Sequence, residues 1–86
     1  MNKTFEICNL VLATADLMDL IEITGNENEY TIEASLVAKY IKDYNPNIDE
    51  LTRYIRRVFV TYFEECFELE TCEMVADCIL KNLEEV

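Results

Sequence analysis

Apolar residues recur at three- and four-residue steps along four stretches of the chain, which is the spacing of one face of an α-helix. The first stretch covers residues 4–23, and the others cover 31–44, 47–67 and 71–84. Polar side chains lie between the apolar ones in each stretch, so one face can be buried while the other meets water. The pattern therefore predicts four amphipathic helices.

The single glycine and the single proline of the chain mark ends of these helices. Gly25 follows the first stretch, and Pro46 separates the second from the third because the residue before a proline is pushed out of the α region. Asn47 and Glu50 have the spacing of a capping box, and Thr71 is a candidate cap for the last helix. The connections between the four predicted helices are only a few residues long, which favours an antiparallel arrangement of the helices. We therefore expect a compact four-helix bundle of the all-α class.

Residues 20–34 leave a second interpretation open. Apolar and polar residues alternate in 20–24 and again in 30–34, on either side of the polar loop 25–29, which is typical of a β-hairpin. A lone hairpin is only marginally stable in water, so we expect helix and keep a short β-hairpin as the alternative. Residues 1–86 form one domain in both cases, because the length leaves no room for a second core. The side chains expected in that core are Leu12, Leu36, Leu51, Ile55, Val58 and Ile79.

The chain lacks the residues on which most enzyme sites depend. It has no histidine, one serine and one glycine, which excludes a Ser-His-Asp triad, a zinc site with histidine and a glycine-rich phosphate loop. The spacing of the four cysteines provides no Cys-x-x-Cys pair for zinc, and we interpret them as reduced, apolar side chains. An export signal and an apolar run of about 20 residues are also missing. We therefore expect a cytoplasmic protein with no cofactor, no membrane contact and no catalytic activity.

Acidic residues are the most informative feature of the sequence. The formal net charge is −11, beyond the magnitude of about 2–8 that suffices to keep a small domain soluble. The carboxylates gather in two blocks, residues 6–33 and 64–86, in which Lys81 is the only cation. Many of them are like-charge neighbours three or four residues apart, and each such pair costs a helix a few tenths of a kcal/mol. A charge pattern kept at that cost indicates a negative surface that binds a basic partner.

We expect this partner to be the basic surface of a nucleic-acid-binding protein, because carboxylates at helical spacing of about 5–6 Å can imitate a row of phosphates. The residues expected to contact it are Asp16, Asp19, Glu22, Glu27, Glu29, Glu64, Glu68, Glu73 and Asp77. In size, acidity and lack of catalytic motifs, the chain resembles the small phage-encoded inhibitors of host nucleic-acid enzymes, which include anti-CRISPR and DNA-mimic proteins. That resemblance implies a non-catalytic inhibitor.

Two other functions remain open. Aromatic residues on more than one side of the 47–67 helix indicate a wide apolar face, which suits a homodimer acting as a regulatory or scaffold module. Residues 36–57 also resemble a degenerate helix-turn-helix regulator, with Arg53, Arg56 and Arg57 on its second helix. A chain of net charge −11 repels the phosphates that supply most of the affinity for DNA, so we expect no direct contact with nucleic acid.

Overall fold

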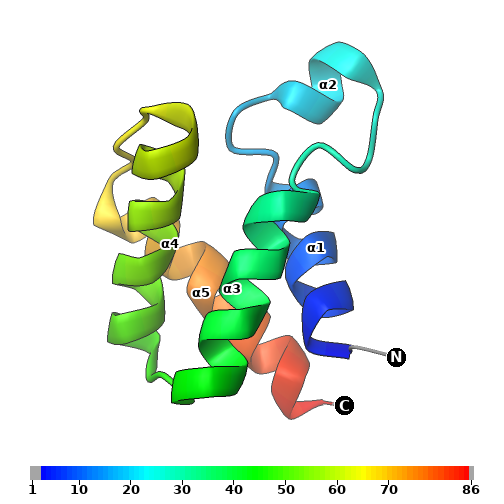
Figure 1. Ribbon diagram of the computed structural model, residues 1–86. Coiled ribbons are helices and arrows are strands. Elements are labelled where there is room, and N and C mark those ends of the chain that lie inside the picture. The colour runs from blue at the N-terminus through cyan, green and yellow to red at the C-terminus, as the bar shows by residue number, and fades with distance from the viewer. Residues whose placement is uncertain (1–2, 86) are drawn as a thin grey trace.

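The computed structural model describes residues 3–85, and this part of the chain contains five helices (Figure 1). They are α1 (Lys3–Ala15), α2 (Leu20–Thr24), α3 (Thr31–Tyr44), α4 (Ile48–Phe63) and α5 (Leu69–Glu84). The four long helices form a bundle, and the short α2 lies at one end of it (Figure 1). The predicted all-α bundle is therefore confirmed, with one additional short helix.

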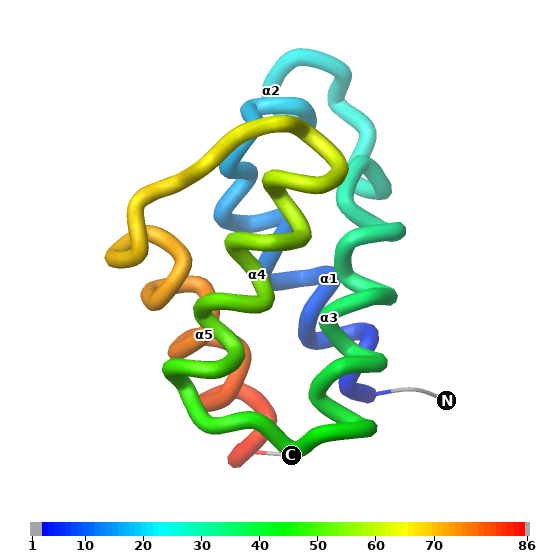
Figure 2. Tube along the Cα trace, turned by 60° about the vertical axis from the view of Figure 1, so that its left-hand side comes forward, coloured from blue at the N-terminus to red at the C-terminus, as the bar shows by residue number. Residues whose placement is uncertain are grey.

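The four long helices pack as two pairs. Contact is most extensive between α4 and α5 and between α1 and α3, and α1 joins the pairs by packing on α5. The α3–α4 contact is the least extensive of the four, although the two helices run side by side in opposite directions in both views (Figures 1 and 2). The seam between α3 and α4 is thus the loosest in the bundle.

The core lies where the apolar faces of the long helices meet, and five of the six predicted core residues are there. These are Leu12, Leu51, Ile55, Val58 and Ile79. The prediction for Leu36 is wrong, because this side chain is only half-buried. The buried face of α3 consists of smaller residues such as Ala34, Val37 and Ala38, which bring α3 close to α1 and leave Leu36 at the edge of the contact.

The first helix ends at Ala15 and does not continue to residue 23 as predicted. Asp16 and Asp19 have φ angles of 43° and 56°, in the left-handed region that a right-handed helix cannot include. The Asp16 carboxylate accepts hydrogen bonds from the backbone N–H groups of Ile21 and Glu22, at 3.1 and 3.0 Å. An Asp side chain that binds these N–H groups competes with helix continuation, and the apolar periodicity does not reveal that competition.

The alternative of a β-hairpin over 20–34 is also wrong, since residues 3–85 contain no strand. Residues 20–24 form α2, which Gly25 ends with a φ angle of 73°. Glycine adopts this left-handed conformation without steric cost, and its N–H donates to the Ile21 carbonyl at 2.7 Å. A turn over residues 27–30 then leads into α3.

The remaining helices differ from the prediction mainly at their ends. The predicted capping box is confirmed: Asn47 Oδ1 accepts from the Glu50 N–H at 2.8 Å, and the Glu50 carboxylate accepts from the Asn47 N–H at 3.0 Å. Helix α4 ends at Phe63 and not at residue 67, because Glu64 takes a left-handed φ of 56°. Helix α5 begins at Leu69, so Thr71 is not its cap as predicted.

Candidate interaction surfaces

Parts of the two acidic blocks meet at the end of the bundle where α2 lies. Tyr30 is fully buried there, and its ring centroid is 6.2 Å from that of Phe59 and 6.1 Å from that of Phe63. These ring contacts join the two acidic segments of this end, residues 16–30 and 63–68, which we call the acidic end. Neither segment contains Lys or Arg, so its carboxylates have no cation within their own segments.

Asp16 belongs to the framework of the acidic end. Its carboxylate accepts a hydrogen bond from the Tyr30 hydroxyl at 2.6 Å, in addition to the two backbone N–H groups of α2. Desolvation acts to raise the pKa of Asp16, but these hydrogen bonds outweigh it and hold the pKa below its usual value. Burial, with the Asp16 contact, raises the pKa of Tyr30 to about 12. The Asp16 carboxylate thus holds the acidic end together, and its contact with a partner stays a prediction.

The other predicted contact residues fall into two places. Glu29 is half-buried and accepts a hydrogen bond from the Asn26 side-chain amide at 3.3 Å, and Asp77 pairs with Lys81 at 3.0 Å. The exposed ones are Asp19, Glu22, Glu27, Glu64, Glu68 and Glu73. Of all these, Glu73 and Asp77 lie along α5, outside the acidic end. The fold therefore gathers most, but not all, of the predicted residues at one end.

An apolar groove of about 290 Å³ lies between α1 and α5. Its walls include Leu10 and Met74, which are 65% and 72% exposed. Glu70 and Asp77 stand one helical turn from Met74, so carboxylates border the groove on the α5 side. Sequence reasoning missed this groove, although two large apolar residues outside the buried stripes of their helices are a signal that could have indicated it.

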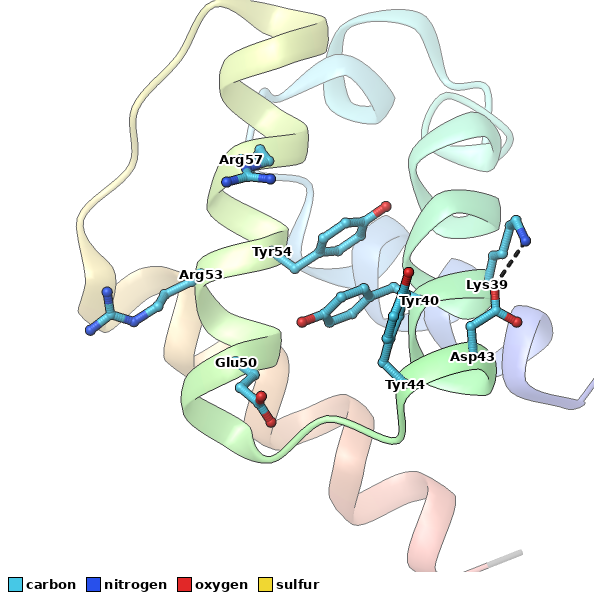
Figure 3. A pocket seen from close by; sticks show the side chains of 8 residues that line it. All are labelled: Lys39, Tyr40, Asp43, Tyr44, Glu50, Arg53, Tyr54 and Arg57. Atoms are coloured by element: carbon cyan, nitrogen blue, oxygen red, sulfur yellow. Dashed lines mark hydrogen bonds and ion pairs between the residues drawn. The ribbon is translucent and has the colours of Figure 1, made fainter.

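A second concave surface opens at the loose seam between α3 and α4, and we call it the tyrosine cleft (Figure 3). It has a volume of about 570 Å³ and is lined by Lys39, Tyr40, Asp43, Tyr44, Glu50, Arg53, Tyr54 and Arg57. The rings of Tyr40 and Tyr54 stack across the seam, with centroids 4.0 Å apart and an interplanar angle of 2°. The Tyr44 ring follows at 5.2 Å from that of Tyr40. Sequence reasoning did not predict this cleft.

The cations of the tyrosine cleft differ in how far they are neutralised. Lys39 pairs with Asp43 at 2.9 Å, and Arg53 reaches Asp49 at 3.3 Å on the exposed surface. Arg57 forms no ion pair with the residues that the structure describes. In Figure 3 the Arg57 guanidinium lies near the tyrosine rings, whereas Arg53 points away from them. Arg57 is therefore the least neutralised cation beside the rings.

Charged side chains on both sides of this cleft affect the pKa of Tyr54. Burial, followed by the nearby tyrosines, raises the pKa of its hydroxyl, while the charges of Arg57 and Lys39 act to lower it. A cation from α4, Arg57, and a cation from α3, Lys39, both line the cleft together with Tyr54. The cleft thus combines flat aromatic surface with positive charge in a strongly acidic protein.

The three arginines considered for a recognition helix do not form one exposed row. Arg56 is half-buried, and its Nε has no hydrogen-bond partner, whereas Arg53 and Arg57 stand one turn apart along the tyrosine cleft. Helices α3 and α4 also lie side by side in opposite directions (Figures 1 and 2), while the helices of a helix-turn-helix cross at about 90–120°. The arrangement is that of an antiparallel helical hairpin.

Cys8 and Cys72 are buried, Cys66 and Cys78 are exposed, and all four are free thiols. Burial raises the pKa of Cys8 to about 12 and raises the pKa of Cys72, which makes both buried thiols poor nucleophiles. Residues 3–85 hold no cluster of three or more metal-ligating side chains. Within the same range, every helix is too short or too polar to cross a membrane.

Comparison with known proteins identifies the family of the chain without identifying an activity. No curated protein and no solved structure matches it. Residues 18–85 match the family model of DUF1871, a domain of unknown function. The matched region holds α2 to α5, and with them nearly all of the acidic end and the whole tyrosine cleft. Because this match covers most of the chain, the protein belongs to the DUF1871 family.

Proposed function

We propose that this protein is a non-catalytic, cytoplasmic binding module that docks its acidic end on the basic surface of a nucleic-acid-binding protein and inhibits that protein. The observation that carries the proposal is the meeting of two acidic segments, 16–30 and 63–68, around the buried ring of Tyr30. Carboxylates far apart in the chain thereby share one end of the bundle. A solubilising surface does not need this concentration of one sign of charge.

The electrostatics of the acidic end favour association with a positive surface. Its exposed carboxylates repel one another, and a cationic partner relieves that repulsion while steering the encounter. Binding of this kind weakens as salt rises, because charges more than a Debye length apart, about 10 Å at 0.1 M salt, are screened. The proposal therefore requires an association that depends steeply on ionic strength.

The direct test is displacement of DNA-binding proteins from DNA-cellulose loaded with a bacterial lysate. The wild-type protein should release a bound protein at low salt and lose this ability at high salt. Two double charge reversals should abolish release, one with Glu22→Lys and Glu27→Lys and the other with Glu64→Lys and Glu68→Lys. All four side chains are exposed, so these variants should stay folded.

The matched control carries Glu84→Lys and Glu85→Lys, which make the same change in net charge at the C-terminal end of α5. This variant should release the bound protein as well as the wild type does. Equal loss in all three variants would show that net charge alone matters, and no loss in any of them would contradict the proposal.

A homodimeric scaffold module is the second candidate function, and the exposed apolar side chains of Leu10 and Met74 favour it. Joining two α1–α5 grooves would remove these side chains from water. Sedimentation equilibrium over a wide range of protein concentration tests it, with Leu10→Glu as the disrupting variant. A dimer that this substitution dissociates would support the scaffold function, and a monomer at every concentration would exclude it.

A further inference from the structure

The tyrosine cleft is not used by the proposed function, which rests on the acidic end. It lies at the far end of the α3–α4 seam from α2, as the positions of Tyr40, Tyr44 and Tyr54 on these helices require (Figures 1 and 3). Its three aromatic rings and its unpaired arginine are chemically unlike the rest of the surface. The two sites can therefore be tested separately.

The aromatic part of the cleft is open to solvent at Tyr44. Tyr44 is 71% exposed, and its ring packs beside the Tyr40–Tyr54 stack, with its centroid 5.2 Å from that of Tyr40 and its plane tilted by 40° to it. Its hydroxyl forms no hydrogen bond with the described residues, so neither burial nor polar contact explains an aromatic residue here. A planar ring placed on the Tyr44 ring would be stabilised by stacking.

The charged part of the cleft favours an anion. Arg57 has no ion-pair partner in the described chain, and a guanidinium binds phosphate through paired hydrogen bonds. Of the two carboxylates in the lining, Asp43 is held by Lys39 at 2.9 Å. Glu50 is held by the N–H of Asn47 in the capping box. Both carboxylates keep their negative charge, but the lining holds three cations against these two, and Arg57 is the one that has no ion pair in the described chain.

The size of the cleft favours an anion that carries a ring over a small inorganic anion. A volume of about 570 Å³ lies within the range of about 300–1,000 Å³ that is usual for small-molecule sites, and it is large for inorganic phosphate alone. A long nucleic-acid strand would also have to pass the acidic surfaces of a chain with net charge −11, which repel its phosphates. A free mononucleotide fills more of this volume than inorganic phosphate does, and with a single phosphate group it meets less repulsion than a strand.

We propose that the tyrosine cleft binds a free mononucleotide, with the base stacked on Tyr44 and the phosphate held by Arg57. In Figure 3 the rings of Tyr40 and Tyr54 lie between these two residues, so the sugar would cross the edge of the stacked pair. Arg53, one helical turn from Arg57 and only loosely paired, is placed to swing toward the phosphate. The three remaining lining residues Lys39, Asp43 and Glu50 form the rim.

The test is titration with AMP, followed by calorimetry and by the NMR shifts of the tyrosine ring protons. Tyr44→Ala and Arg57→Gln should each weaken AMP binding about tenfold or more. Tyr62→Ala and Lys42→Gln are the matched controls, because both side chains are exposed and lie outside the cleft lining. These controls should change affinity less than about twofold. Thermal melts of all four variants verify that they are folded.

Separate titrations test adenosine, inorganic phosphate and a short single strand of DNA or RNA in place of AMP. Adenosine alone and inorganic phosphate alone should each bind at least about tenfold more weakly than AMP. Phosphate that binds as tightly as AMP, or AMP binding that Tyr44→Ala leaves unchanged, would overturn the proposal. A short single strand of DNA or RNA that binds more tightly than AMP would overturn the assignment to a free nucleotide. Absence of AMP binding at millimolar concentration would overturn it altogether. None of these outcomes depends on the charge-reversal variants of the acidic end.

Discussion

The acidic end and the tyrosine cleft are both built around tyrosine, yet the residue has a different role in each. Tyr30 is fully buried, its hydroxyl donates to Asp16 at 2.6 Å, and it accepts from the Met18 N–H at 3.0 Å. Tyr44 is largely exposed, and its hydroxyl has no partner in the described residues. Burial and polar satisfaction, and not residue type, therefore separate a structural tyrosine from one available to a ligand.

The acidic end and the tyrosine cleft also differ in the sign of their charged side chains and in which of these have partners. The acidic end contains no Lys or Arg in its segments 16–30 and 63–68, and its one well-bonded carboxylate, Asp16, is satisfied by hydrogen-bond donors of its own segment. The tyrosine cleft pairs Lys39 but leaves Arg57 without a carboxylate. The acidic end therefore exposes charge of one sign, whereas the cleft lining holds three cations against two carboxylates, which suits two different ligands.

The largest expected effect contrasts two alanine substitutions. Tyr30→Ala should lower the free energy of unfolding by about 3–5 kcal/mol, because it leaves a cavity among Phe59 and Phe63 and removes the support of α2. Tyr44→Ala should change it by less than about 0.5 kcal/mol. Urea unfolding of both variants checks the pair, and similar losses in the two would break the distinction drawn between them.

The same elements show how far the sequence predicts this structure. Apolar periodicity places the four long helices, and the Asn47 capping box is local enough to be read directly. Periodicity does not reveal the helix break at Asp16, because the Asp16 carboxylate is held by backbone N–H groups of α2 and by the Tyr30 hydroxyl, fourteen positions away in the chain. The acidic residues are visible in the sequence, but their meeting depends on the nonlocal contact between Tyr30 and Phe63.

The sequence pattern does not predict the tyrosine cleft, for a related reason. Tyr40, Tyr44 and Tyr54 occupy positions compatible with a buried helical face, and only the separation of α3 from α4 decides whether their rings are covered. That separation follows from how all four helices pack, with α1 and α5 forming the closer contacts. Local spacing contains no information on it.

A smaller effect isolates the Tyr30 hydroxyl. Tyr30→Phe keeps the ring packing but deprives Asp16 of one donor and the Met18 N–H of its acceptor. We expect a loss of about 1–3 kcal/mol, because partly buried polar groups are left unsatisfied. Urea unfolding measures the loss, and stability equal to that of the wild type would show that the ring alone holds the acidic end.

The smallest effect concerns Glu33, a carboxylate of the first acidic block that is buried while most others are exposed. Burial raises the pKa of Glu33, and its Oε1 has no hydrogen-bond partner. The folded state therefore binds this proton more tightly than the unfolded chain does, and ionisation at neutral pH destabilises the fold.

Glu33→Gln should accordingly stabilise the protein at neutral pH. The gain should shrink as the pH falls through the raised pKa of the folded state, and it should vanish below the ordinary glutamate pKa of about 4.3. Urea unfolding of both proteins across this pH range gives the answer. A variant less stable than the wild type at neutral pH would mean that the Glu33 carboxylate has a favourable partner.

The central claim is that exposed carboxylates of the acidic end serve binding and not stability. The most direct measurement is the association rate constant with the protein released from DNA-cellulose, for the wild type and for the variant with Glu22→Lys and Glu27→Lys. The variant should associate about tenfold more slowly or worse at low salt, while its melting temperature should be no lower than that of the wild type. The control variant, with Glu84→Lys and Glu85→Lys, should associate as fast as the wild type. An unchanged rate constant in a folded variant would contradict the claim.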